Sequence, residues 1–270
     1  MPELPEVETT RRGLEPLLIG KEIAGFEIRQ PSLRWPVEET LLARLEGQRI
    51  NALGRRGKYL LILADAGSLL LHLGMSGSLR FLEAPRPPAT HDHLDLVFAG
   101  GARLRFTDPR RFGSLHFTDS PENHWLLRHL GREPLGEAFS SEYLRRCARG
   151  RRVPIKQLLM NSRVVAGIGN IYASEALYRA GIHPRRASGS VSPARFGRLV
   201  ESIKLVLREA IEVGGTTLRD FVDGDGRPGY FQLALRVYGR AGEPCRSCGR
   251  PIRQIVLGQR ATYYCPGCQR

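Results

Sequence analysis

Four cysteines near the C-terminus restrict the fold of this chain more than any other feature. They stand in two pairs, Cys245-x2-Cys248 and Cys265-x2-Cys268, with sixteen residues between the pairs. Four thiolates at this spacing are typical of a tetrahedral structural zinc site on a β-hairpin. Two disulfides or a redox-active dithiol are the alternative interpretations. A block of about thirty residues builds little core by itself, so the zinc ion would supply the local folding energy.

The amino terminus carries the second unusual pattern, Met1-Pro-Glu-Leu-Pro-Glu. Because proline is a small second residue, we expect Met1 to be removed, which leaves a secondary amine on Pro2. An α-amino group titrates near pH ~7.7–8.0 and is therefore partly nucleophilic at neutral pH. Glu3 and Glu6 follow at the positive end of a predicted helix. An amine beside two carboxyl groups suits imine chemistry with acid–base assistance. A frayed tail before a capped helix is the alternative.

Charge points to a polyanionic partner. The net charge is +14, and only four of the 41 basic residues are lysines. Nucleic acid is the first candidate for this partner and an anionic membrane surface the second. We expect no transmembrane helix, because no run of eighteen apolar residues occurs, and no signal peptide, because the N-terminus is acidic. The fifth cysteine, Cys147, is predicted to be a small buried hydrophobe, and we place the protein in a reducing cytoplasm.

Hydrophobic periodicity predicts an α+β protein of several domains. Residues 2–130 are expected to form an N-terminal β-sandwich flanked by helices, with one helix over 4–18 that ends at Gly20 and a short one over 38–45. The expected strands lie near residues 22–30, 48–54, 58–64, 68–73, 78–82, 93–98, 103–107 and 114–118.

Helical patterns dominate the chain after that block. We expect a helical domain over residues 131–240 and the zinc-finger β-hairpin over 241–270. Gly214 is expected to end the longest helix, and the glycine-rich stretch 223–229 to form a mobile loop. The expected helices are 122–129, 141–149, 154–161, 170–179 and 193–212.

Two glycine-flanked turns and one glycine-rich helix start carry the remaining candidates. The sequence Gly167-Ile-Gly-Asn170 precedes a predicted helix and would expose N–H groups to a phosphate, to which Lys156 could add charge. This gives a helix–two-turns–helix unit. The turns 72–77 and 108–113 carry Met75, and Arg110 with Phe112. An apolar tip beside an arginine suits a wedge between stacked bases, whereas strand-end core positions are the alternative. Lys58 follows Arg55-Arg56-Gly57 at a strand start, where it could contact a phosphate, serve in acid–base chemistry or simply be solvated.

Together these motifs resemble the bacterial formamidopyrimidine-DNA glycosylases, which excise oxidised purines from DNA. The resemblance covers essentially the whole chain: PELPEVET at the start, GKYLL, HLGMSGSL, DPRRFG, GIGNIYASEAL, and the four-cysteine finger with QRATYYC. A related family of the endonuclease VIII type acts on oxidised pyrimidines and typically opens with PEGPE. Leu4 favours the purine-directed branch.

The resemblance implies a bifunctional glycosylase and AP lyase of base excision repair. Pro2 would attack the sugar and form a Schiff base, Glu3 would assist by proton transfer, and Glu6 would orient the site. Lys58 and Arg260 would donate protons in β- and δ-elimination.

It also implies a binding surface for double-stranded damaged DNA. Met75, Arg110 and Phe112 would fill the hole left by a flipped nucleotide. The segment 216–231, including Tyr230, would close on the damaged base. Phosphates would be held by Lys156, Asn170, His91 and Arg151.

The implied protein is a monomeric, cytoplasmic, nucleoid-associated enzyme with one structural zinc and no membrane association. Two other functions stay open from the sequence: an oxidised-pyrimidine glycosylase, and a non-catalytic zinc-finger DNA-binding protein. The second leaves the Pro2–Glu3 terminus unexplained.

Overall fold

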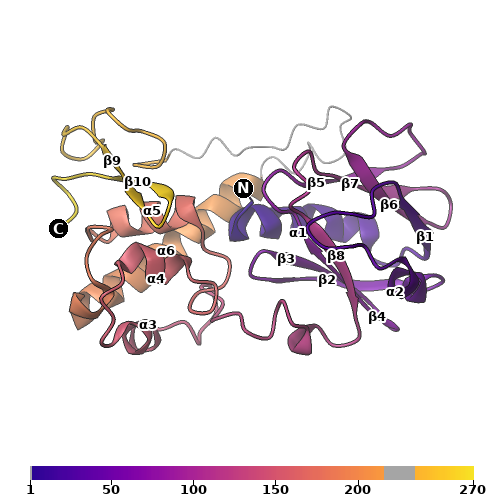
Figure 1. Ribbon diagram of the computed structural model, residues 1–270, viewed down its shortest axis with the longest axis horizontal. Coiled ribbons are helices and arrows are strands. Elements are labelled where there is room, and N and C mark those ends of the chain that lie inside the picture. Colours follow the sequence, from indigo (N-terminus) through magenta and orange to yellow (C-terminus); the bar gives the residue numbers. More distant parts are fainter. Residues whose placement is uncertain (1, 216–234) are drawn as a thin grey trace. The chain divides into compact units, whose positions relative to one another are not determined.

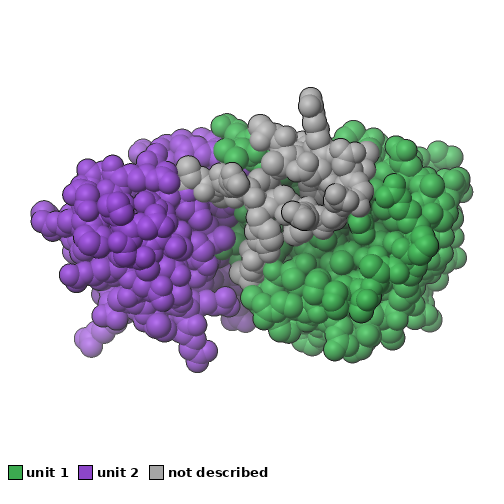
Figure 2. All heavy atoms as spheres, turned by 90° about the horizontal axis from the view of Figure 1, so that it is seen from above, with its two compact units in different colours: residues 1–128, 211–231 green, residues 129–210, 232–270 purple. Residues whose placement is uncertain are grey.

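The computed structural model describes residues 2–215 and 235–270, which divide into two compact units (Figure 2). Unit 1 contains the described residues of 1–128 and 211–231, and unit 2 those of 129–210 and 232–270. No helix within the described ranges is long and apolar enough to cross a bilayer.

Unit 1 is a β-sandwich of two four-stranded antiparallel sheets (Figure 1). Apolar side chains from both sheets meet in one core, because alternate strand residues point inward. The strand order is β1-β6-β7-β5 in one sheet and β2-β3-β4-β8 in the other. The bounds are β1 (Ile23–Ile28), β2 (Ile50–Arg56), β3 (Tyr59–Ala64), β4 (Gly67–His72), β5 (Ser78–Leu82), β6 (Asp92–Phe98), β7 (Arg103–Thr107) and β8 (Ser114–Thr118).

The first helix, α1 (Leu4–Leu18), covers part of this sandwich. Pro5 stands in its first turn, where the missing N–H costs nothing, and its apolar stripe is buried over β2 and β3. The eight expected strands and this helix are all present. The short helix expected over 38–45 is divided into α2 (Glu39–Leu42) and a 3-10 turn, η1 (Ala43–Leu45).

The helix expected over residues 122–129 is wrong. Only the 3-10 turn η2 (Pro121–Asn123) forms there. Local hydrogen bonds compete with the helix: the Ser120 hydroxyl donates to Glu122, and the Asn123 amide donates to Ser120. Trp125 instead turns toward Trp35, with the two rings 5.1 Å apart.

Unit 2 combines helices with a two-stranded hairpin (Figure 1). The elements are α3 (Ser141–Ala148), α4 (Ile155–Met160), α5 (Asn170–Arg179), the 3-10 turn η3 (Ser188–Ser190), α6 (Pro193–Gly215), β9 (Arg253–Leu257) and β10 (Arg260–Tyr264). The helix α6 extends one residue past Gly214, which was expected to end it, and its last described residue is a second glycine, Gly215. The hairpin packs on α5 through β10.

Candidate active site and nucleic-acid interface

The start of α1 presents Pro2 and Glu3 together. Pro2 is partly exposed, whereas the Glu3 side chain is only 1% exposed. Glu3 is the N-cap of α1, and its backbone N–H donates to the Glu6 carboxylate at 2.8 Å as part of a capping box. Glu6 therefore fixes the chain direction at the residue that follows Pro2. This geometry places the buried Glu3 carboxyl group directly after the partly exposed Pro2.

A charged bridge connects α1 to the turn that carries Lys58. Arg55, near the end of β2, donates to the Glu8 carboxylate at 3.1 Å and to the Gly57 carbonyl at 2.9 Å. Burial opposes ionisation of Glu8, but its hydrogen bonds with Arg11 and Arg12 hold its pKa below the usual value. Because Glu8 lies one turn beyond the start of α1, the bridge holds the Lys58 turn near the helix's N-terminal end.

His72 and Arg34 belong to the surroundings of Lys58, and the motif analysis assigned neither of them a role. The His72 ring lies against Tyr59, with centroids 4.7 Å apart, and its Nδ1 accepts from the Gly74 N–H at 3.0 Å. Burial, with the charges of Lys58 and Arg34, lowers the pKa of His72 to about 4. The imidazole is therefore neutral at physiological pH. Its position at the head of the 72–77 motif was the only signal in the sequence.

The two glycine-flanked turns present three side chains to solvent. Met75 is partly exposed, Arg110 is exposed and Phe112 is 43% exposed, so none of them is a core residue. The Arg110 guanidinium lies over the Phe112 ring, 4.9 Å from its centroid. A paired aromatic ring and guanidinium on the surface can stack on a base and donate to its edge.

Lys156 and Asn170 lie side by side in unit 2, but they face the zinc-finger hairpin. Lys156 is 1% exposed, and its ammonium donates to Asn170 Oδ1 and to Thr262 Oγ1 at 2.6 Å. The Asn170 amide donates to the Ala261 carbonyl at 2.9 Å. These bonds join the start of α4, the start of α5 and β10, so the helix–two-turns–helix unit and the finger form one continuous structure.

The other proposed DNA contacts lie on exposed surface. His91, Arg151 and Arg260 are exposed. Arg260 begins β10 directly after a two-residue turn, Gly258-Gln259, in which both residues have positive φ. Tyr230 and the segment 216–231 lie outside the described residues.

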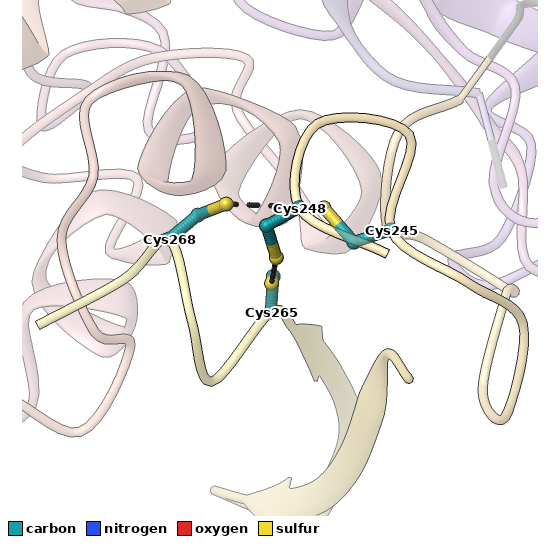
Figure 3. A group of neighbouring side chains, drawn as sticks. All are labelled: Cys245, Cys248, Cys265 and Cys268. Carbon is teal, nitrogen blue, oxygen red and sulfur yellow. Dashed lines mark hydrogen bonds between the residues drawn. The ribbon is translucent and has the colours of Figure 1, made fainter. Parts of the chain in front are cut away.

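The four cysteines converge at the base of the finger (Figure 3). All four sulfur atoms lie within 4.8 Å of one another, and Sγ of Cys248 is 3.4 Å from that of Cys265. Ligands at about 2.3 Å around a tetrahedral zinc stand about 3.8 Å apart. Burial and the neighbouring sulfurs raise the pKa of Cys268 to about 12, and a bound cation would favour its thiolate form. The cysteines fit one structural zinc ion.

Glu175 is a buried carboxylate for which the sequence motifs predicted no role. Its side chain is 6% exposed and accepts three backbone N–H bonds: Oε2 from Arg236 at 2.8 Å, and Oε1 from Val237 at 2.9 Å and from Tyr238 at 2.8 Å. These bonds attach the segment that leads into the finger, residues 236–238, to α5. Glu175 lies within the motif GIGNIYASEAL, but a motif does not reveal contacts with residues about sixty positions away, so only the tertiary structure shows them.

Three family profiles match successive parts of the chain. They are the formamidopyrimidine-DNA glycosylase N-terminal domain over residues 1–115, the formamidopyrimidine-DNA glycosylase H2TH domain over 130–222, and the zinc finger found in FPG and IleRS over 242–270. Curated relatives agree along the full length. The formamidopyrimidine-DNA glycosylase of Alkalilimnicola ehrlichii is 58% identical over 277 residues, and that of Stutzerimonas stutzeri 58% over 270, each covering 100% of both chains.

Solved structures share the fold. The MutM (Fpg) protein of Thermus thermophilus superposes with a TM-score of 0.85 at 43% identity, covering 99% of this chain and 98% of that one. The Lactococcus lactis Fpg (MutM) protein in complex with a Fapy-dG containing DNA gives a TM-score of 0.88 at 36% identity, covering 99% of this chain and 100% of that one.

Proposed function

Because this chain belongs to the formamidopyrimidine-DNA glycosylase family, we propose that it acts in base excision repair as a bifunctional glycosylase and AP lyase. Its partner is double-stranded DNA that contains oxidised purines such as 8-oxoguanine and formamidopyrimidines. The finger holds one structural zinc through Cys245, Cys248, Cys265 and Cys268.

The observation that carries the catalytic assignment is the pairing of Pro2 with a buried Glu3 at the start of α1. Once Met1 is removed, the Pro2 amine attacks the anomeric carbon of the damaged nucleotide and the bond to the base breaks, with Glu3 moving a proton to the sugar or the leaving base. Loss of the ring oxygen from the anomeric carbon gives an iminium. Glu6 keeps the two residues oriented through its bond to the Glu3 N–H at 2.8 Å.

Two eliminations then cut the strand. Loss of a proton from the sugar C2′ expels the 3′-phosphate, with Lys58 as the proton donor for β-elimination. A second proton loss expels the 5′-phosphate, with Arg260 as the donor for δ-elimination. The result is a one-nucleotide gap with phosphate at both ends, and hydrolysis of the remaining imine returns the Pro2 amine.

DNA is held by residues of both units. Met75, Arg110 and Phe112 fill the position vacated by the flipped nucleotide, which offsets part of the unstacking cost. Lys156, Asn170, His91 and Arg151 hold phosphates, and the segment with Tyr230 closes on the base. We assign residues 2–130 to catalysis, 131–240 to DNA binding and 241–270 to the finger. The protein acts as a monomer in the cytoplasm, associated with the nucleoid.

Borohydride trapping tests the chemistry directly. Wild type, Pro2→Gly and the exposed-loop control Pro85→Gly are incubated with a duplex that contains 8-oxoguanine opposite cytosine. We expect a covalent adduct mapped to Pro2 for wild type and for the control, and a reduced adduct for Pro2→Gly, which retains a primary amine. The intact mass must first show that Met1 is absent.

The remaining outcomes separate the competing functions. An adduct with a thymine glycol duplex alone would transfer the protein to the pyrimidine-directed branch. A zinc-loaded, Met1-free preparation that gives no adduct with either lesion, or with a bare abasic site, would leave a DNA-binding protein without catalysis.

A further inference from the structure

The carboxylate of Asp108 lies at the centre of the two turns that present Met75, Arg110 and Phe112. Its side chain is 0% exposed. Oδ1 accepts from the Ser76 hydroxyl at 2.6 Å and from the Arg110 N–H at 3.3 Å, and Oδ2 accepts from the Gly113 N–H at 2.7 Å. One buried carboxylate therefore binds the turn 72–77 to both ends of the segment 110–113.

The backbone of Asp108 extends the same network to His93 in β6 and to the nearby His91. Its carbonyl oxygen accepts from His93 Nε2 at 2.7 Å and from the Arg111 N–H at 3.1 Å. Its own N–H donates to the His91 carbonyl at 3.0 Å. All these groups lie in unit 1, so the network is internal to one compact body.

The two turns also pack backbone against backbone. A Cβ added at Gly74 would stand 2.4 Å from the Phe112 carbonyl carbon, and one added at Gly113 would stand 2.9 Å from the His72 carbonyl oxygen. Arg111 holds a positive φ of 54°, which a free loop would avoid. The two turns thus pack so closely that a change in the backbone of one turn displaces the other.

We propose that Asp108 is the positioning residue that holds Met75, Arg110 and Phe112 as one preorganised wedge. The inference rests on the proposed function, in which these three side chains enter the base stack. A wedge that is already ordered loses little conformational freedom on insertion, so more of its contact energy opposes restacking of the flipped base. Asp108 touches neither DNA nor the reacting atoms, and it acts through the turns.

Three variants separate this role from general stabilisation. Asp108→Ala removes all three side-chain acceptor contacts. Asp108→Asn is isosteric, but its amide N–H2 faces a donor at Ser76 or at Gly113, so one bond is lost. Ser76→Ala removes the hydroxyl that donates to Asp108 and accepts from the Arg110 N–H at 3.2 Å, and it leaves the carboxylate in place. Asp119→Ala is the matched control, because Asp119 is an exposed aspartate of the same unit that pairs with Arg44 on the surface.

Each variant is assayed on two substrates. Excision of 8-oxoguanine opposite cytosine in a duplex needs a base to be displaced, whereas cleavage of a single-stranded oligonucleotide with a preformed abasic site does not. We expect Asp108→Ala to lower kcat/KM on the duplex by on the order of 100-fold, as for a misplaced positioning group. Asp108→Asn should lose about tenfold, as for one hydrogen bond to a charged acceptor, and Ser76→Ala about threefold, because the Arg110 N–H keeps Asp108 as its acceptor. Single-strand cleavage should change less than about threefold in all three, because no wedge is used.

Two further readouts test the coupling. A 2-aminopurine beside the lesion brightens when the wedge unstacks it, and this signal should fall in the order of the duplex losses. The Ser76→Ala/Asp108→Ala double variant should lose less than the two single losses combined, because the Ser76–Asp108 bond is shared and only the Ser76 contact with the Arg110 N–H is separate.

The outcomes are distinguishable. Equal losses on both substrates in Asp108→Asn and Ser76→Ala would show a general structural role and overturn the inference. The inference would also be overturned if Asp108→Ala kept its duplex activity while Phe112→Ala lost it. In that case the wedge would function without Asp108. Unchanged duplex activity in Phe112→Ala would contradict the role of these side chains as a wedge. A wild type that gives no trapped adduct would contradict the proposed function.

Discussion

The β-sandwich and the zinc finger are stabilised by different interactions. The sandwich buries a core to which both sheets and α1 contribute. Among the described residues, the buried cluster at the finger consists of Val237, which precedes the finger, and of Cys245, Ile252 and Cys265. Residues outside the finger complete it: the Tyr178 hydroxyl shares a hydrogen bond of 2.8 Å with Ser247 Oγ, and the Ile182 carbonyl accepts from Gln269. Lys156 and Glu175 add hydrogen bonds from α4 and α5.

This difference shows how a small element becomes rigid enough to place Arg260. A core of four residues cannot offset the loss of chain entropy for about thirty residues. Metal coordination and hydrogen bonds to the neighbouring helices supply the rest. The sandwich needs no ligand, so the conditions that disorder the finger should leave the Pro2 site folded.

Removal of zinc should give the largest effect and separates the two regions most clearly. A chelator, or Cys265→Ala, should abolish amide-exchange protection of residues 242–270, because structural zinc contributes about 10–16 kcal/mol in comparable sites. Protection in the sandwich strands should stay unchanged in the same sample. A hairpin that remains protected without metal would show that the helices alone suffice to fold it.

Loss of Arg105 should be the largest single change within the sandwich. Arg105 is 2% exposed and donates to Asp95, which is 0% exposed. Arg105→Met removes a buried donor that Asp95 and Asp92 share, while Asp95 keeps Arg29, so the free energy of unfolding in urea should fall by about 1.5–3 kcal/mol. The control Arg80→Met removes only a 3.9 Å contact and should cost less than about 1 kcal/mol.

The same network has a defined pH dependence. Burial alone would raise the pKa of Asp95, but its hydrogen bonds to Arg105 and Arg29 hold it at about 2. The pair therefore stabilises the fold above the ordinary aspartate pKa of about 3.9 and loses this contribution as pH falls toward 2. Arg105→Met should unfold with a flatter pH dependence in that window than wild type, and an equal slope would contradict the assignment.

Lys156 tests whether a buried lysine serves the finger, the DNA or both. Lys156→Met keeps the apolar stem and removes the ammonium that donates to Thr262 at 2.6 Å. We expect hairpin protection to fall by about 1–3 kcal/mol, because Asn170 and Thr262 lose a charged donor. The slope of log affinity for DNA against log salt should drop by about 0.9 if a phosphate is lost. The control Thr262→Val should weaken the hairpin and leave that slope unchanged.

His116 should give the sandwich a milder sensitivity to acid. Burial and the neighbouring His124 lower the pKa of His116 to about 4. The unfolded chain binds a proton near pH ~6.5 and the folded chain does not, so stability falls as pH drops from about 6.5 to about 4. His116→Leu should flatten this decline in thermal unfolding and change stability at pH ~7.5 by less than about 1 kcal/mol. An undiminished decline would place its cause elsewhere.

A surface ion pair should give the smallest effect. Arg49 donates to Glu22 at 3.3 Å, and their side chains are 67% and 42% exposed. Arg49→Ala should change the free energy of unfolding by less than about 0.5 kcal/mol. Added salt should change this difference by no more than the same amount. A loss above about 1 kcal/mol would mean that exposed charge contributes to the sandwich far more than its geometry indicates.

Local patterns predicted most of the fold but failed where tertiary contacts decide. The eight strands, α1 and the finger spacing follow from alternation, proline position and cysteine pairs, all of which act within a few residues. The helix expected over 122–129 did not form, since the side chains of Ser120 and Asn123 hydrogen-bond locally instead, and Trp125 lies against Trp35. Gly214 did not end α6.

The sequence by itself determined the chemistry: the Pro2–Glu3 terminus, the four zinc ligands and the motif order that identifies the family. Only the tertiary structure decided which side chains position that chemistry. Asp108 accepts from the Ser76 hydroxyl at 2.6 Å and so joins two turns that lie about thirty residues apart in the sequence. Glu175 binds a segment about sixty residues away. Lys156 lies buried against β10 rather than on the surface. Such roles depend on which acceptors lie within hydrogen-bond distance after folding, and a linear pattern carries no record of that distance.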